Sequence, residues 1–301
     1  MNNFLFKKKM KNYNTIVIAG GGMKGFAILG VLQYLYQSKL LKNIKKYIGT
    51  SVGAMLSVLM VLEYQPIEIS LHLSRSPEFK KFIVCNIYNG IHGKGVINYD
   101  YFETILKELI LKKTDKIPTF QELYDKHPCE IYMITFNYSL NKEELLSRQT
   151  TPNLNILDAM RMSSNVPFLF GNYKNGDYFY FDGFITNIFP IDKIDTEKDV
   201  VLGISTLQDR WKKETDTTKL NTWKIAWNVF FLPFFKIQRV SCKDFMEHCD
   251  ILYITSHLGS FFDISVNTTK ILDFFSNGYS IAKNSPFFIK SDLKSETLYE
   301  K

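Results

Sequence analysis

Five consecutive residues, Gly49-Thr50-Ser51-Val52-Gly53, place a serine between two glycines directly after a short apolar run. Glycine loses more conformational freedom on folding than other residues, so two glycines this close indicate a local geometric requirement. Residues 51–63 are nearly all apolar and predict a buried helix. The pattern is typical of a sharp strand-to-helix turn that lifts a serine hydroxyl clear of a sheet. A glycine-flanked N-cap serine is the alternative.

Apolar β-branched runs alternate with helical periodicity along the chain. Strands are predicted over residues 14–20, 44–49, 130–138, 178–183, 199–206 and 249–256, and helices over 23–40, 51–63, 99–113, 153–164 and 266–284. This alternation favours an α/β fold with a largely parallel sheet. The 301 residues contain no Gly/Ser/Pro-rich linker and no repeat, so we expect a single domain over residues 1–301.

A second glycine-rich turn, Gly20-Gly21-Gly22-Met23-Lys24-Gly25, follows the first predicted strand. The spacing matches a dinucleotide-binding turn, but that site needs an acidic residue about 20 residues later, and residues 40–50 contain none. Consecutive glycine N–H groups at the start of a helix also bind negative charge. If that charge is the oxyanion formed when an ester is attacked, the turn is an oxyanion hole. A tight turn required by packing alone is the alternative.

The serine needs a base, and two kinds are available in the sequence. In α/β-hydrolases the order is serine, acid, histidine, and only His248 and His257 lie late enough to fit it. An acid also stands out, because Asp182-Gly183 ends the aromatic strand predicted over residues 178–183. An aspartate held against a serine can act as the base without histidine. A simple Asp-Gly β-turn is the alternative.

Together these motifs resemble the patatin-like phospholipase family. The family has GGGxKG or GGGxRG after the first strand, GxSxG after the second, and Asp-Gly-Gly or Asp-Gly-Ala much later, and this order is present here. A small-residue helix end followed by proline and an aromatic residue is also similar, at Ser163, Ser164, Pro167 and Phe170. The loop after the aspartate keeps Asn187 and Pro190, as the family's does. The resemblance covers about residues 14–206.

The resemblance implies a three-layer patatin-like α/β fold, with a mostly parallel central sheet flanked by helices. It implies a serine hydrolase of carboxylic esters, in which Ser51 is the nucleophile and Asp182 the base. The backbone N–H groups around Gly21 and Gly22 would form the oxyanion hole, with Lys24 supporting the loop. The substrate would be a phospholipid or another glycerolipid, and neither a metal nor a cofactor is implied.

One departure from the family concerns the residue after Asp182-Gly183, where Phe184 replaces a small residue. A bulky side chain there would narrow the site or shift the aspartate. Two alternatives to a phospholipase A or lysophospholipase therefore stay open. One is a Ser–Asp–His esterase of soluble esters that uses His248 or His257, and the other is a catalytically weak, membrane-binding relative.

Charge and cysteine content bear on partners and location. The net charge is +7, and Lys7, Lys8, Lys9 and Lys11 form an N-terminal cluster, which fits nucleic acid, an anionic membrane or no specific partner. With the resemblance to lipid hydrolases, we expect contact with an anionic membrane surface and none with nucleic acid. The four cysteines form no CxxC pair, which favours a reducing compartment. We see neither a signal peptide nor a transmembrane run, and expect a cytoplasmic protein peripheral to membranes. The oligomeric state stays open.

The longest apolar run lies within residues 221–240. Five aromatic residues in it fall on one face of a predicted helix: Trp223, Trp227, Phe230, Phe231 and Phe234. We expect this face to be a lid or to contact lipid, with a buried core helix as the alternative. The single domain would then comprise an N-terminal extension (1–13), a catalytic core (14–206), the lid segment (207–248) and a C-terminal strand and helix (249–301).

Overall fold

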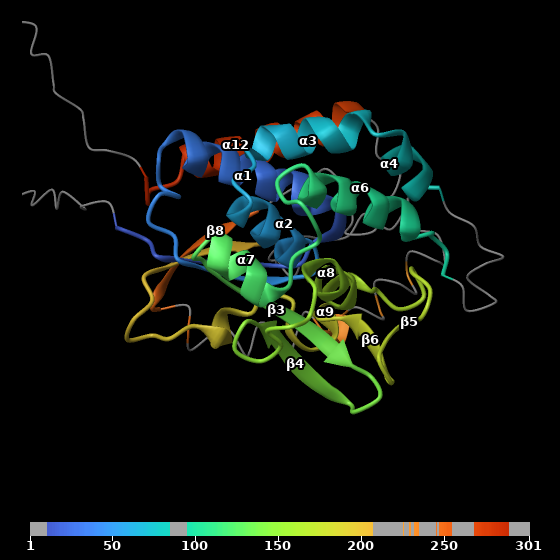
Figure 1. Cartoon of the computed structure of the whole chain (residues 1–301). Helices are drawn as coiled ribbons and strands as arrows, with labels where there is room; N and C mark the ends of the chain where they lie inside the picture. Colours follow the sequence, from blue (N-terminus) through green and yellow to red (C-terminus); the bar gives the residue numbers. More distant parts are fainter. Residues whose placement is uncertain are drawn as a thin grey trace, which may run out of the picture.

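The computed structural model describes residues 11–84, 95–206, 225, 229, 232–234, 245, 247–254 and 268–288. Within these residues an eight-stranded sheet has the order β5-β6-β3-β2-β1-β7-β8, and β4 pairs with β3 (Figure 1). The strands are β1 (Thr15–Ile18), β2 (Lys46–Thr50), β3 (Glu130–Asn137), β4 (Lys142–Ser147), β5 (Tyr173–Asn175), β6 (Tyr178–Asp182), β7 (Val201–Ser205) and β8 (Cys249–Tyr253).

The interior of the sheet is parallel. Strands β3, β2, β1, β7 and β8 pair in parallel, while β4, β5 and β6 pair antiparallel. Parallel strands are covered on both faces, which explains why β1 is an uninterrupted run of buried residues. All six strands predicted from the sequence are present. The predicted α/β class, with a mostly parallel sheet flanked by helices, is therefore confirmed.

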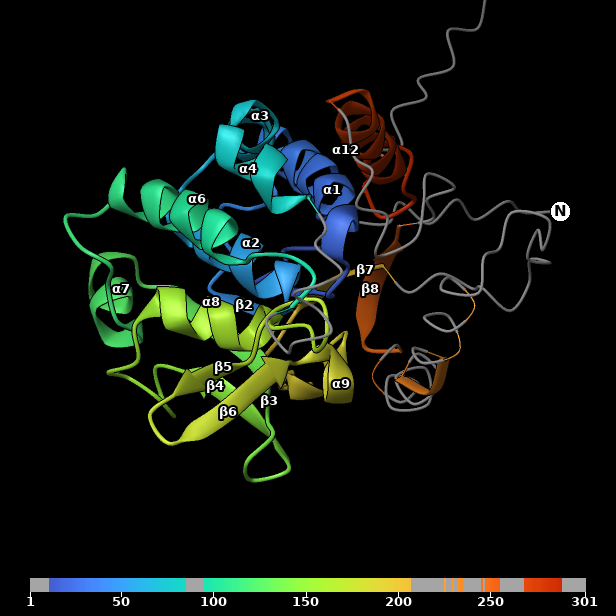
Figure 2. The ribbon, with the colours of Figure 1, turned by 90° about the vertical axis from the view of Figure 1, so that its right-hand side faces the viewer.

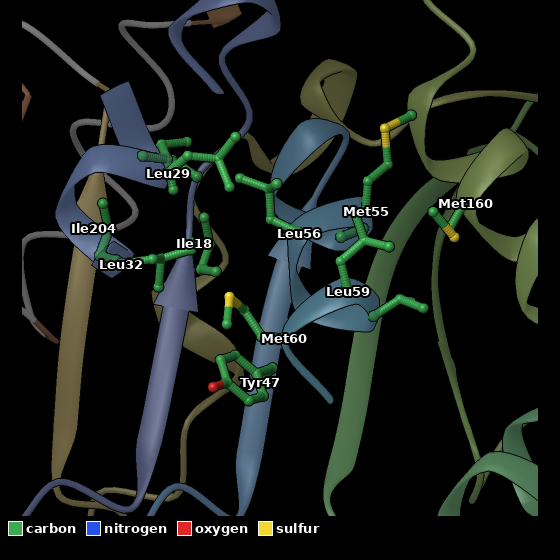
Figure 3. Packing of buried hydrophobic residues seen from close by; sticks show 14 of the residues in the cluster. Ile18, Leu29, Leu32, Tyr47, Met55, Leu56, Leu59, Met60, Met160 and Ile204 are labelled. Carbon is green, nitrogen blue, oxygen red and sulfur yellow. The ribbon is translucent and has the colours of Figure 1, made fainter. Parts of the chain in front are cut away.

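Several helices stack in two tiers over one face of the sheet (Figure 1). The helices are α1 (Gly25–Gln37), α2 (Val52–Val61), α3 (Pro66–Arg75), α4 (Pro77–Phe82), α6 (Asp100–Leu111), α7 (Phe120–Lys126), α8 (Ile156–Ser164), α9 (Phe184–Asn187) and α12 (Thr268–Lys283), with 3-10 turns at Gly22–Lys24 and Ile191–Lys193. Figure 1 shows α1 and α2 between the sheet and the outer helices α3, α4 and α6. Leu29 of α1 and Leu56 of α2 point toward one another in this inner tier (Figure 3).

Strand β3 is the element that brings distant segments together. β4 pairs with β3 residues 132–137 and so occupies one edge of that strand. β2 pairs with residues 130–134 and β6 with residues 135–137, so these two strands share the other edge. They approach end to end, because Thr50 at the end of β2 lies opposite Ile134, and Asp182 at the end of β6 lies opposite Thr135.

The helix α12 packs along α1, as Figures 1 and 2 both show. The two backbones touch, because a Cβ on Gly278 of α12 would collide with the carbonyl oxygen of Ala27 in α1. The reverse holds for Gly30 of α1, where a Cβ would collide with the carbonyl oxygen of Phe275. This contact holds α1, and with it the glycine-rich turn at its start, against the last described helix.

Candidate active site

Ser51 occupies the turn from β2 into α2, with a backbone φ of 56° and ψ of −123°. Positive φ is unfavourable for a residue with a side chain, and such strain is found at functional turns. Gly53 permits the turn, because a Cβ there would collide with the carbonyl oxygen of Ile18. Ser51 stands at the N-cap position of α2, as the alternative interpretation expected, but its side chain makes no capping hydrogen bond to the helix.

The ends of α8 and α9 hold this turn through the Ser51 backbone and through Thr50. The Thr50 hydroxyl donates to the carbonyl oxygen of Asn187 at 2.8 Å. The N–H of Ser51 donates to Oγ of Ser163 at 3.0 Å, and that hydroxyl donates to the carbonyl oxygen of Ile134 at 2.6 Å. None of these bonds uses the Ser51 hydroxyl, which stays available for chemistry.

Asp182 is a buried carboxylate with an incomplete set of hydrogen bonds. Its side chain is almost inaccessible to solvent, and Oδ1 accepts from the Phe184 N–H at 2.8 Å. Oδ2 is buried and has no hydrogen bond of ordinary length to any described residue. Burial raises the pKa of Asp182 to about 7, while hydrogen bonding from Ser51 and the Phe184 N–H lowers it in part. The carboxyl group is therefore poised to exchange a proton near neutrality.

Ser51 and Asp182 meet because β2 and β6 end against each other on β3. The Ser51 hydroxyl is near enough to lower the pKa of the carboxyl, yet Oδ2 lacks a bond of ordinary length. We conclude that the contact between the two side chains is long. Such contacts are common in unliganded active sites and tighten when substrate binds.

The glycine-rich turn lies beside this pair, because β1 and β2 are adjacent parallel strands. Gly21, Gly22 and Met23 line the same cavity as Ser51, and their N–H groups have no acceptor among the described residues. Gly20 differs, since its N–H donates to the carbonyl oxygen of Ile188 at 2.7 Å. Gly20, which the motif placed in the oxyanion hole, is therefore not an available donor.

Lys24 and Gly25 stabilise the turn through hydrogen bonds, so their backbone N–H groups are not available to an oxyanion. The Lys24 side chain is fully buried, and its Nζ donates to the carbonyl oxygen of Thr206 at 3.3 Å. The Thr206 hydroxyl donates to the carbonyl oxygen of Gly20. The N–H of Gly25 closes onto the turn through the carbonyl oxygens of Gly22 and Met23. The loop after β7 thus braces the turn from its other side.

An apolar cavity opens from these groups and runs among the helices. Ser51, Asp182 and the glycine turn line one end, and α1, α2, α3, α4 and α6 supply much of the rest, including Leu29, Met55, Leu59, Phe79 and Leu109. Its polar side chains are Ser51, Asp182, Ser164 and Tyr99. A cavity of this composition favours a hydrocarbon ligand with one polar group at the end that Ser51 lines.

Tyr99 was not identified from the sequence. It comes just before the amphipathic helix α6, and its hydroxyl and Oγ of Ser164 lie 2.8 Å apart. Ser164 donates its own proton to the carbonyl oxygen of Met160, so Tyr99 is the donor in this pair. The guanidinium of Arg161 stacks 3.6 Å from the centre of the Tyr99 ring. No local pattern marked this tyrosine, because its role depends on a contact between α6 and α8.

Phe184 does not displace the aspartate. Its ring is buried, lines the cavity and packs edge to face on Phe234, with ring centres 5.5 Å apart. Its backbone N–H holds Oδ1 of Asp182, a bond that any non-proline residue can make. The bulky side chain therefore shapes the cavity wall while the backbone keeps the carboxylate near Ser51.

Of the two candidate histidines and the predicted aromatic face, only His248 and Phe234 belong to the described residues, and Phe234 packs on Phe184. His248 is exposed and is not among the residues that line the cavity. His257 lies outside the described residues, as do Trp223, Trp227, Phe230 and Phe231. Within the described ranges, no single helix is long and apolar enough to cross a bilayer, and only α2 and α3 together, bent by 120°, reach that length and composition.

The chain matches a protein-family model and resembles proteins of large viruses. The family model described as patatin-like phospholipase matches residues 16–194. The probable lipid hydrolase 463L of Invertebrate iridescent virus 6 is 30% identical over 223 residues, which is 70% of this chain and 76% of that protein. The uncharacterized protein R571 of Acanthamoeba polyphaga mimivirus is 27% identical over 194 residues, which is 63% of this chain and 64% of that protein.

Among solved structures, VipD from Legionella pneumophila resembles this chain with a TM-score of 0.50. The two are 17% identical, and the match covers 91% of this chain and 66% of VipD. At this identity the likeness concerns the fold alone.

Proposed function

The chain belongs to the patatin-like phospholipase family, and from this premise we propose that it is a lipid acyl hydrolase. The proposed reaction cleaves a glycerolipid ester, in the manner of a phospholipase A or lysophospholipase, through an acyl-serine intermediate. The observation that carries the proposal is the carboxylate of Asp182, buried beside Ser51 with Oδ2 unpartnered, where an apolar cavity begins.

In the first half-reaction Asp182 removes the hydroxyl proton as Oγ of Ser51 attacks the ester carbonyl carbon. The carbonyl oxygen becomes an oxyanion, and the N–H groups of Gly21, Gly22 and Met23 are the donors that would stabilise it. The C–O bond to the glycerol then breaks, and the leaving alcohol takes the proton from Asp182. The acyl group remains on Ser51 as an ester.

In the second half-reaction Asp182 takes a proton from a water molecule, whose oxygen attacks the acyl carbon. The same donors would stabilise the second oxyanion. The bond from Ser51 Oγ to the acyl carbon breaks, Ser51 recovers the proton from Asp182, and the fatty acid leaves. A base with a pKa of about 7 suits both directions of proton transfer near neutral pH.

The proposal extends to where the protein acts and how it is organised. A net charge of +7 supports peripheral contact with anionic membranes, with the aromatic face of residues 223–231 as the contacting segment. We propose that residues 1–301 act as a single domain, with the catalytic core at residues 14–206. The close packing of α1 against α12 supports this organisation, because it brings together helices from the two ends of the described chain.

The deciding experiment measures fatty acid released from phospholipid vesicles by wild type and by Ser51→Ala. We expect release by wild type, in the presence or absence of a chelator, and none above background by the variant. A fluorophosphonate should label wild type at Ser51 only. Equal labelling of Ser51→Ala would show that another residue is the nucleophile.

A further inference from the structure

The cavity follows two helices along most of their length. Four residues of α2, Val52, Met55, Leu56 and Leu59, line it at positions i, i+3, i+4 and i+7. On α6, Phe102, Leu106 and Leu109 line it at i, i+4 and i+7. Each set forms one face of its helix, so the cavity is bounded by α2 on one side and α6 on the other.

Both helices lead away from the same polar end. Ser51 precedes α2, and Tyr99, which precedes α6, contacts Ser164 in the wall near Asp182. At the far end the Tyr64 hydroxyl, just after α2, donates to the carbonyl oxygen of Leu109 at 2.8 Å. This bond ties the two helices together beyond Leu59 and Leu109, both of which are buried.

The length of the cavity along α2 follows from helix geometry. Val52 and Leu59 are seven residues apart, which at the rise of an α-helix is about 10 Å, the extended length of roughly eight methylenes. A straight acyl chain attached to Ser51 would therefore reach Leu59 and Leu109 with about its eighth to tenth carbon.

We propose that Leu59 and Leu109 close the acyl cavity and set the chain length beyond which further methylenes add nothing to turnover. This inference rests on the proposed function, because it assigns the cavity to the acyl group of the substrate. The specificity-determining contacts would lie at the helix ends tied by Tyr64, about 10 Å from the reacting ester.

The test is a chain-length profile measured with monomeric p-nitrophenyl esters of 4 to 12 carbons. For wild type we expect kcat/KM to rise up to about fourfold per methylene, the equivalent of about 0.8 kcal/mol, and to stop rising near eight to ten carbons. Leu59→Phe should move the end of the rise about two carbons shorter, and Leu59→Ala about two carbons longer.

Leu62→Ala is the matched control. Leu62 is a buried leucine at the end of α2 that does not line the cavity, so its loss should lower the melting temperature without moving the profile. Leu109→Phe provides the same shortening from α6 if Leu59→Phe does not fold. The position of the profile, unlike its height, is insensitive to general loss of stability.

The proposal is overturned if the Leu59 and Leu109 variants keep the wild-type profile, or if Leu62→Ala shifts it equally. It is also overturned if kcat/KM of wild type keeps rising through 12 carbons at a constant rate. Failure of the proposed function looks different, because wild type would then hydrolyse no ester of any length and Ser51 would not react with a fluorophosphonate.

Discussion

Two aspartates with nearly inaccessible side chains lie at opposite ends of the sheet and have opposite surroundings. Asp199 lies at the amino end of β1 and β2, where Lys46 donates to both of its oxygens at 2.8 and 2.7 Å. The Thr15 hydroxyl and the Asp195 N–H complete its set at 3.0 and 2.8 Å. Asp182, at the other end, has one backbone donor on Oδ1 and an unpartnered Oδ2.

The contrast separates a structural carboxylate from a reactive one. A carboxylate with an ion pair and a full set of hydrogen bonds stabilises the fold through those contacts. A buried carboxylate without a cation beside it carries a free-energy penalty in its charged form, and the same penalty makes it a base near pH 7. Burial alone therefore does not mark the proposed base, and what distinguishes Asp182 from Asp199 is an unpartnered oxygen with no cation beside it.

The largest expected effect follows from removing the Asp182 carboxylate, and it is an effect on turnover. Asp182→Asn removes the proposed base and should lower kcat/KM for any ester substrate at least 10²-fold, which is typical for loss of general-base catalysis. His248→Ala, at an exposed position away from the cavity, is the control and should stay within a few-fold of wild type. A collapse of activity in His248→Ala instead would point to a Ser–Asp–His esterase.

A smaller effect is expected from pH. Asp182 must be deprotonated to act as a base, and its pKa is about 7. As pH falls below 7, kcat/KM should therefore fall, approaching tenfold per unit, and above pH 7 it should level off. A profile that remains flat down to pH 5 would contradict the assignment of the base.

The smallest effect on activity is expected at the structural carboxylate. Asp199→Asn should leave kcat/KM within twofold of wild type, because Asp199 lies at the far end of the sheet. It should instead lower the free energy of unfolding by about 2 kcal/mol, since Lys46 loses its buried partner. Urea titration with a parallel ester assay separates the two results, and a tenfold loss of activity at unchanged stability would refute the division of roles.

The two asparagine variants should change the free energy of unfolding in opposite directions. The pKa of Asp182 is raised on folding from an ordinary 3.8 to about 7, so the stability that its neutral form confers is lost as pH rises through 7. Asp182→Asn should therefore gain about 4 kcal/mol relative to wild type between pH 4 and pH 8. Asp199→Asn should be less stable than wild type at pH 8. A loss of stability relative to wild type in both variants as pH rises from 4 to 8 would count against the contrast.

The parts of the site that the sequence predicted are those encoded by neighbouring residues. The turn at Ser51 depends on glycines within two positions, and the glycine-rich turn depends on one strand and one helix. Their chemistry is local, and the structure places both turns where the pattern indicated. The aspartate also ends its strand as predicted.

What the sequence could not supply is pairing across long distances. That β2 and β6 share one edge of β3 decides which carboxylate meets Ser51, and no local pattern encodes strand order. The hydrogen bond from the Gly20 N–H to the carbonyl oxygen of Ile188 also depends on a contact between distant segments, so the sequence could not predict it. β5 is three residues long and α4 is a six-residue helix that begins at a proline, so both are too short for a periodic pattern.

The contact between α1 and α12 has a consequence for how the chain folds. Gly30 and Gly278 are nearly 250 residues apart, and contacts of such long sequence separation form slowly, because the entropy of closing the loop must be overcome first. We expect α12 to dock late, after β1 and β2 have paired. The glycine-rich turn at the start of α1 would then be fixed in place at the end of folding. Pulse-labelled hydrogen exchange during refolding would show this order, with amides of α12 protected no earlier than those of the central strands.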